Sequence, residues 1–296
     1  MDSVKKRNIF LGVILLLVVI LAVISIVTLV KGPRQSSVEV ISKTGPTELT
    51  VNDMYEGNMT IPYFDIPTSN YPPDKFLENK GVITYEGGDS YVGINVNSQK
   101  GEIDWNQVAE SGVDYAMIRV GWRGDESGKI AADEKFEDNI QGALDAGLPV
   151  GVYFYSKAVT EAEAEEEATF VLEQIRGYNV KYPVAFYWEY GTKDDGSLDE
   201  SKRTVRCNGK QVTAFIDTFC KKVKAAGFTA SYYCDKTMGY TRLDLSQLSG
   251  YDMWYAEFRS APSFYYDYGM WQYTKAGTVP GIEGSVPINL SLKKYG

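Results

Sequence analysis

The stretch "YVGINVNSQKGEIDWNQVAESGVDYAMIRV", residues 91–120, sets the pattern that the rest of the chain follows. An apolar run of strand length (91–96) precedes an amphipathic segment of helix length (104–111), and a second apolar run follows (114–120). A helical segment between two such runs is typical of a β-α-β unit, whose two strands pair in parallel. The stretch therefore predicts the start of a parallel sheet covered by helices.

The same alternation continues beyond residue 120 and predicts an α/β fold. We expect strands at 91–96, 114–120, 149–155, 183–189, 229–234, 252–258, 269–274 and 286–291. We expect helices at about 104–111, 133–147, 160–178 and 210–227. After residue 234 the spacers shorten and helical segments nearly vanish. Eight strands with about five helices predict a TIM-like (β/α) barrel over residues 89–296, whose last three units have lost most of their helices.

An apolar segment precedes this domain. Residues 9–30, "IFLGVILLLVVILAVISIVTLV", carry no charge and are long enough to cross a bilayer as a helix. No small-residue cleavage site follows, so we expect an uncleaved signal anchor rather than a removed signal peptide. Basic residues at 5–7 place residues 1–8 in the cytoplasm. The expected location is therefore the cell membrane, crossed once, with the C-terminal domain extracellular.

Residues 31–88 are rich in turn formers, with short apolar pieces between them. We expect an extracellular stalk whose second half drapes over the following domain. About 20 residues of fully extended chain would reach roughly 65 Å.

Composition excludes several kinds of site. The net charge of −9 argues against a nucleic-acid partner, because no dominant basic surface is available to neutralise phosphates. The absence of histidine excludes Ser-His-Asp and Cys-His catalysis and any His-ligated metal. No cofactor and no metal are expected. Cys207, Cys220 and Cys234 allow at most one intramolecular disulfide, and whether any two of them pair is left open.

The candidate site is read from the strand ends, because catalytic groups of such barrels lie at the carboxyl ends of the strands. Those ends carry Asn95, Arg119, Trp122, Arg123, Tyr153, Tyr155, Tyr187, Glu189, Tyr233, Asp235, Glu257, Gln272 and Asn289. Alternation along a strand places Tyr187 and Glu189 on the same face. Aromatic rings and amides around one acid are more typical of a carbohydrate cleft than of a phosphate or metal site, although any single tyrosine could equally belong to the core.

Three stretches resemble the family 25 glycoside hydrolases: "GINVNSQKGEIDWNQVAESGVDYAMIRVGWRG" (93–124), "FEDNIQGALDAGLPVGVYFYSKAVTEAEA" (136–164) and "MWQYTKAGTVPGIEGSVPINLS" (270–291). These enzymes are lysozymes that cut the bond from N-acetylmuramic acid to N-acetylglucosamine in peptidoglycan. The resemblance implies a flattened barrel with fewer helices than strands, and peptidoglycan glycan strands as the partner. It implies substrate-binding roles for Arg119, Tyr153, Tyr155, Trp271, Gln272 and Asn289.

The chain departs from the family pattern at its acids. The family's first strand reads Gly-Ile-Asp-Val-Ser, where this chain has Asn95. The fourth strand ends Asp-x-Glu in the family and Tyr187-Trp188-Glu189 here. The last strand carries Val-Asp-Leu-Asn in the family, and Pro287 follows Val286 here. Of the four acids that the resemblance implies, Glu189 is the one retained.

Three functions follow as alternatives. The leading prediction is a membrane-anchored, lysozyme-like protein that binds peptidoglycan and has lost or reduced muramidase activity, because a lone acid lacks the negative partner that stabilises the developing cation. The second is an active N-acetylmuramidase that uses Glu189 with a rewired partner, either Tyr187 as nucleophile or Glu257 or Asp235 as a substitute carboxylate. The third is a scaffold that no longer binds sugar.

Overall fold

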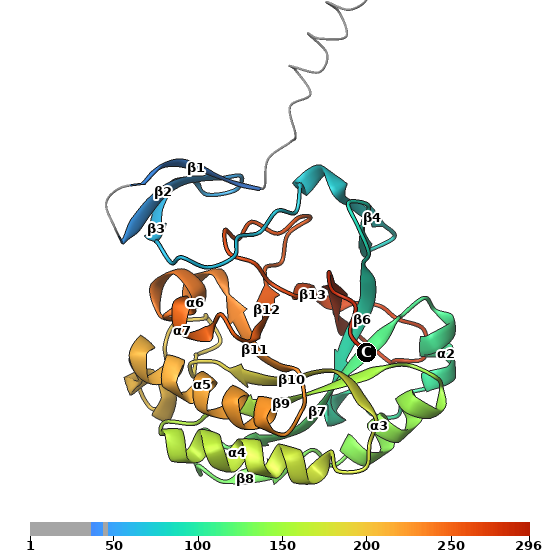
Figure 1. The fold of residues 1–296 in the computed structure, drawn as a ribbon. Coiled ribbons are helices and arrows are strands. Elements are labelled where there is room, and N and C mark those ends of the chain that lie inside the picture. Colours follow the sequence, from blue (N-terminus) through green and yellow to red (C-terminus); the bar gives the residue numbers. More distant parts are fainter. Residues whose placement is uncertain (1–36, 44–46) are drawn as a thin grey trace, which may run out of the picture. The chain divides into compact units, whose positions relative to one another are not determined.

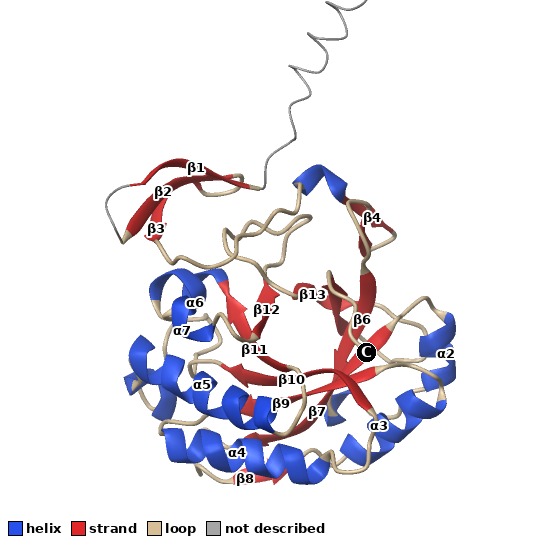
Figure 2. Cartoon of the chain, in the orientation of Figure 1, coloured by secondary structure: helices blue, strands red, loops and turns tan. Residues whose placement is uncertain are grey.

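The computed structural model describes residues 37–43 and 47–296 (Figures 1 and 2). The predicted membrane anchor, residues 9–30, and the cytoplasmic segment before it lie outside the described residues. Within the described ranges, no helix combines the length and the apolar character needed to cross a bilayer.

A closed barrel of eight strands forms the centre of the fold, as the sequence predicts. The strands are β6 (Tyr91–Val96), β7 (Tyr115–Arg123), β9 (Val150–Ser156), β10 (Val180–Trp188), β11 (Ala230–Asp235), β12 (Asp252–Ala256), β13 (Met270–Gly277) and β14 (Val286–Ser291). They pair in the order β6-β14-β13-β12-β11-β10-β9-β7, and the pairing of β6 with β7 closes the ring. A short strand, β8 (Ile130–Ala132), pairs antiparallel with the end of β7.

The last strand differs from the expected parallel pattern. β14 runs antiparallel to both of its neighbours, β13 and β6. Only residues 278–285 connect β13 to β14, and a parallel crossover needs a dozen or more residues. The start of β14, with Pro287, therefore lies where the other strands end, and Asn289 lies deeper in the barrel.

The helices occupy the expected positions. They are α2 (Trp105–Glu110), α3 (Phe136–Asp145), α4 (Glu161–Gln174), α5 (Gly209–Ala225), α6 (Lys236–Thr241) and α7 (Leu245–Leu248). Short 3-10 turns are η1 (Pro73–Lys75), η2 (Ser98–Lys100) and η3 (Arg203–Arg206). The four predicted helices are confirmed, and the Thr160 hydroxyl caps α4 by accepting from the Glu163 amide. After β11 only the short α6 and α7 remain, so α3, α4 and α5 cover the outside of the barrel (Figure 2).

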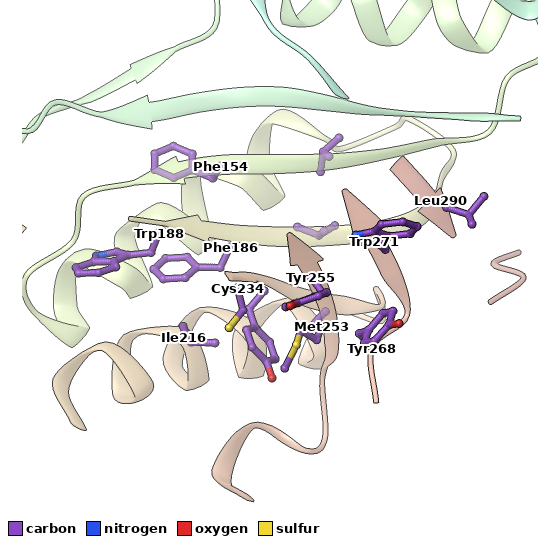
Figure 3. Packing of buried hydrophobic residues seen from close by; sticks show 14 of the residues in the cluster. Phe154, Phe186, Trp188, Ile216, Cys234, Met253, Tyr255, Tyr268, Trp271 and Leu290 are labelled. Carbon is purple, nitrogen blue, oxygen red and sulfur yellow. The ribbon is translucent and has the colours of Figure 1, made fainter. Parts of the chain in front are cut away.

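Side-chain alternation along the strands divides the core into two clusters. On β10, Phe186 and Trp188 face outward and join the larger cluster between the sheet and the helices, part of which Figure 3 shows. Phe186 packs on Phe219 of α5, with ring centroids 4.9 Å apart. Tyr187 faces inward and joins an aromatic cluster inside the barrel. This alternation decides which residues at the strand ends can reach the site.

The described part of the predicted stalk is folded into two small sheets, and its second half lies over the barrel. β1 (Val38–Lys43), β2 (Glu48–Asp53) and β3 (Gly57–Pro62) form an antiparallel sheet, and β4 (Phe76–Asn79) and β5 (Val82–Tyr85) form a hairpin. Val51 and Ile61 are buried, and Asp53 pairs with Lys236 of α6 at 2.8 Å. The ring of Phe76 meets that of Trp271 edge to face at 5.3 Å. The short apolar pieces between the turn formers are thus strands, and their buried faces attach residues 37–88 to the barrel.

Candidate functional site

Two adjoining cavities lie at the carboxyl ends of the barrel strands. The first, here called the neutral cavity, measures about 350 Å³ and is lined by Asn95, Asn97, Gln99, Arg119, Tyr153, Tyr155, Tyr187, Gln272, Lys275 and Pro287. The second, here called the charged cavity, measures about 620 Å³ and is lined by Asp125, Tyr155, Lys157, Glu189, Tyr190, Gly191, Thr192, Gly196, Leu198, Lys202, Asp235, Thr237, Met238, Arg242 and Lys275. Because Tyr155 and Lys275 line both, the two cavities form one cleft.

Glu189 lies just beyond β10, between two tyrosine hydroxyls. Tyr155 donates to its Oε2 at 3.3 Å, and Tyr187 donates to its Oε1 at 3.4 Å. Burial, together with the charge of Glu189, raises the pKa of both hydroxyls, and for Tyr187 the neighbouring Tyr233 adds to this. Both groups therefore remain protonated donors, and a Tyr187 phenolate is strongly disfavoured. This speaks against Tyr187 as the nucleophile.

The positions of the missing acids are filled by neutral groups. Asn95 Oδ1 accepts from Gln272 Nε2 at 2.9 Å and from Asn289 Nδ2 at 3.1 Å. The ring of Tyr187 stacks on that of Tyr233, with centroids 3.7 Å apart, and the Tyr233 hydroxyl donates to Gln272 Oε1 at 3.0 Å. Pro287 closes the rim of the neutral cavity. Hydrogen bonds between amides and phenols thus connect the positions at which the resemblance implies carboxylates.

Arg119 supplies a charge that the protein itself neutralises. Its Nε donates to Asp133 Oδ2 at 2.7 Å, and the Asp133 side chain is fully buried. The guanidinium also lies over the Trp122 ring, 4.8 Å from its centroid. Tyr153, deeper in the same cavity, donates to the Val96 carbonyl, and burial raises its pKa to about 12. Arg119 can therefore donate hydrogen bonds to a ligand, while its own charge is already paired with Asp133.

Two residues expected at the site lie elsewhere. Trp271 is fully buried on the outer face of β13, and its indole nitrogen donates to the Glu257 carbonyl at 2.8 Å. Glu257 lines neither cavity; its carboxylate accepts from Tyr255 and pairs with Lys236 at 2.9 Å. Neighbouring residues of a strand face opposite sides, so Trp271 cannot share the cleft with Gln272. The substrate-binding role of Trp271 and the substitute role of Glu257 are therefore wrong.

Asn289 needs a smaller correction. It is fully buried and does not line either cavity, because β14 is antiparallel and carries it into the barrel. Its Oδ1 accepts from the Trp254 indole at 2.9 Å, while its amide holds Asn95. Asn289 thus orients a residue of the cleft rather than a ligand.

The structure adds charged residues that sequence reasoning missed: Asp125, Lys157, Arg242 and Lys275. Lys157 follows β9 directly, and a charged residue immediately after an apolar strand was a signal that could have found it. Asp125 lies in the turn between β7 and β8, where no periodic pattern indicates its direction. The disulfide question is also settled, because Cys207, Cys220 and Cys234 are buried free thiols.

Comparisons with known proteins agree with the barrel fold. A family model described as "Glycosyl hydrolases family 25" matches residues 94–282. The chain is 28% identical over 199 residues to the autolytic lysozyme of Clostridium acetobutylicum. The matched region makes up 67% of this chain and 54% of that protein. The chain thus spans about half the length of this curated relative.

Solved structures share the fold. The modular autolysin LytC of Streptococcus pneumoniae, solved in complex with a synthetic peptidoglycan ligand, is similar with a TM-score of 0.58 and 21% identity, over 85% of this chain and 57% of that one. A family 25 glycosyl hydrolase of Bacillus anthracis is similar with a TM-score of 0.58 and 19% identity, over 71% of this chain and 92% of that one.

Proposed function

The chain belongs to family 25 of the glycosyl hydrolases, and we propose that its cleft binds the glycan strands of bacterial peptidoglycan with its muramidase activity lost or much reduced. Names and ligands of its relatives support the cell-wall assignment: an autolytic lysozyme, and an autolysin solved with a peptidoglycan ligand. The observation that carries the loss of activity is the replacement of the family's acids around Glu189 by Asn95, Tyr187 and Pro287, all three lining one cavity.

Binding would use the neutral groups of the cleft. Amides of Asn95 and Gln272, the Arg119 guanidinium and tyrosine hydroxyls offer donors and acceptors to sugar hydroxyls and acetamido groups. Stacking of one ring on a sugar contributes on the order of 1 kcal/mol, so we expect weak binding, with a Kd between about micromolar and millimolar.

Hydrolysis would lack a partner for Glu189. In a retaining glycosidase two carboxyl groups lie roughly 5–5.5 Å apart, and the second stabilises the cationic transition state. Among the described residues, no aspartate or glutamate lines the neutral cavity. The groups that contact the Glu189 carboxylate are the hydroxyls of Tyr155 and Tyr187, which supply no negative charge to stabilise a cationic transition state.

One observation favours a second candidate, an active hydrolase in which Asp125 replaces the missing carboxylate. Within the described part of the chain, Asp125 Oδ1 is buried without a hydrogen-bond partner. Tyr155 and Lys157 both contact Glu189, and the charge of Asp125 adds to the rise in the pKa of Tyr155 that burial causes. Asp235 fits this role less well, because its Oδ1 caps α6 by accepting from the Met238 amide at 2.7 Å.

A release assay on purified peptidoglycan separates these candidates. We expect the full chain in detergent to release no reducing ends above background, while pulldown with insoluble peptidoglycan retains it. Glu189→Gln should change neither result. Release by the wild type that Glu189→Gln and Asp125→Asn both abolish would establish the second candidate. Neither release nor retention would favour a scaffold that does not bind sugar.

We also propose that residues 9–30 anchor the protein in the cell membrane with the barrel outside. Support comes from the uncharged apolar run and the basic residues before it. Seven residue-to-residue steps separate residue 30 from Ser37, the first described residue, and they span at most about 25 Å. The link from the anchor would therefore be shorter than the long stalk that the sequence predicts.

Protease treatment of cells stripped of their wall tests this topology. We expect added protease to digest residues 37–296 in intact cells, because the folded part faces outward. A cytoplasmic protein serves as the control for intact membranes. Full protection of the barrel, or recovery of a soluble form that begins near residue 31, would contradict the proposal.

A further inference from the structure

The cleft is divided by charge. Of the ten residues that line the neutral cavity, two are charged, Arg119 and Lys275, and Arg119 is neutralised by Asp133. Of the fifteen that line the charged cavity, seven are charged, four of them cationic. A bare glycan strand carries one kind of charge, the lactyl carboxylate of each muramic acid, and has no cationic group to face the three carboxylates of this wall. The charged cavity therefore requires a different part of the ligand.

Lys157 is the central feature of this wall. Its side chain is 5% exposed, and its ammonium donates to the backbone carbonyl of Glu189 at 2.8 Å and lies 4.9 Å from the Tyr155 ring centroid. It forms no ion pair with a carboxylate of the described residues. An ammonium has three donors, and burying one without a counter-ion is unfavourable. Burial lowers the pKa of Lys157, although the charges of Asp125 and Glu189 act in the opposite direction, and an anion bound in the cavity would further stabilise the ammonium.

Two further cations face the same space without a carboxylate partner among the described residues. The Arg242 guanidinium lies over the Tyr190 ring at 5.6 Å, and the Lys275 ammonium lies over Phe258 at 5.1 Å. Lys202 differs, because Glu126 already pairs with it at 2.9 Å. Three cations without an ion-pair partner in the described ranges, of which Arg242 and Lys275 are exposed, thus line a cavity of mixed charge. It also holds three carboxylates, Asp125, Glu189 and Asp235, and one oxygen of Asp125 is buried without a hydrogen-bond partner in that part of the chain.

We propose that the charged cavity binds the peptide stem of a muramic acid unit whose sugar occupies the neutral cavity, so that the protein selects peptide-bearing glycan over bare glycan. This inference rests on the glycan binding proposed above. Stem peptides carry carboxylates for Lys157, Arg242 and Lys275, and an ammonium group for Asp125. Lys275 and Tyr155 stand between the cavities, where the lactyl link from sugar to peptide would pass.

The test compares ligands that share the disaccharide and differ in the peptide, whose removal leaves a free lactyl carboxylate. Calorimetric titration of the full chain in detergent would use N-acetylglucosaminyl-N-acetylmuramoyl tetrapeptide, the same disaccharide after amidase treatment, and a phosphorylated disaccharide. We expect the peptide-bearing ligand to bind about tenfold more tightly than the bare disaccharide. Lys157→Met and, independently, Arg242→Gln should bring this ratio close to one. Lys222→Met, at a partly exposed lysine of α5 outside the cleft, is the matched control and should leave the ratio unchanged.

Each outcome has one meaning. Equal binding of the two disaccharides by the wild type would overturn the peptide inference and leave glycan binding standing. Tightest binding of the phosphorylated disaccharide would overturn it in favour of a phosphate-bearing wall polymer. If the wild type binds none of the ligands, the proposed glycan-binding function fails together with the inference. Retention of the full ratio in both folded variants would also reject it.

Discussion

The combined substitution Asn95→Asp, Tyr187→Asp and Pro287→Asp should convert this protein into a peptidoglycan hydrolase. It rebuilds the four acids that the family resemblance implies, around the retained Glu189. A preorganised group that stabilises developing charge contributes about 10²–10³-fold to turnover, so a gain of at least this size is expected over the wild type. The measurement is the release of reducing ends from purified peptidoglycan.

The substitutions should differ in their effect on the stability of the fold. An aspartate at 95 can accept the amide hydrogen bonds of Gln272 and Asn289 that Asn95 accepts now. At 187, loss of the ring stacked on Tyr233 leaves a void and should cost about 3–5 kcal/mol of folding free energy. The assay should therefore run at low temperature, after circular dichroism has shown that the variant is folded.

Adding Glu189→Gln to the triple variant provides the control. It should remove the gained activity, because Glu189 would act as the general acid. If the wild type already cleaves at rates typical of lysozymes and Glu189→Gln abolishes that cleavage, the deficient-site proposal is wrong. Asp125 would then be the partner to replace next.

The apolar runs in the sequence predicted the strands of the barrel. They did not predict the direction of the closing strand β14 or the strands that precede the barrel. Eight apolar runs predicted eight strands, because buried strands of a parallel sheet are apolar along their whole length. The direction of β14 depended instead on the length of its connection, residues 278–285, which is too short for a crossover. The strands between residues 38 and 62 were missed because their exposed faces carry polar residues between turn formers, as in β2.

The residues of the site that lie at strand ends were predictable from the sequence, whereas those in loops were not. Strand ends led to Asn95, Arg119, Tyr155, Tyr187 and Glu189, which the structure brings to one cleft. Trp271 followed from the resemblance, although alternation alone shows that adjacent Trp271 and Gln272 face opposite sides. Glu257 was itself read from a strand end, but its carboxylate pairs with Lys236 outside the cleft. Asp125 and Arg242 come from loops, and the direction of a loop side chain depends on tertiary contacts that no local pattern encodes.

Replacing Lys236 by methionine should destabilise the whole folded unit by about 3–5 kcal/mol, because it leaves buried carboxylates without a counter-ion. Lys236 pairs with Asp53 of β2 at 2.8 Å and with Glu257 at 2.9 Å, and their side chains are 0% and 9% exposed. For a domain of this size we expect thermal unfolding near pH 7 to shift downward by roughly 10 °C. A stalk free of the barrel would give no such shift.

The pH dependence of the effect identifies its source. Burial acts to raise the pKa of Asp53, but the Lys236 ammonium and the Tyr55 and Glu56 amides outweigh it and hold that pKa below its usual value. The stabilisation from Asp53 is therefore present above about pH 4 and is lost as the pH falls through the lower folded pKa. In Lys236→Met burial dominates and the pKa rises, so the difference from wild type should shrink as the pH falls towards 4. Lys222→Met, which breaks the exposed pair with Glu165, should cost at most about 1 kcal/mol. An equal loss in both variants, or a Lys236→Met deficit that does not change with pH, would show that the N-terminal sheet is not held to the barrel by this ion cluster.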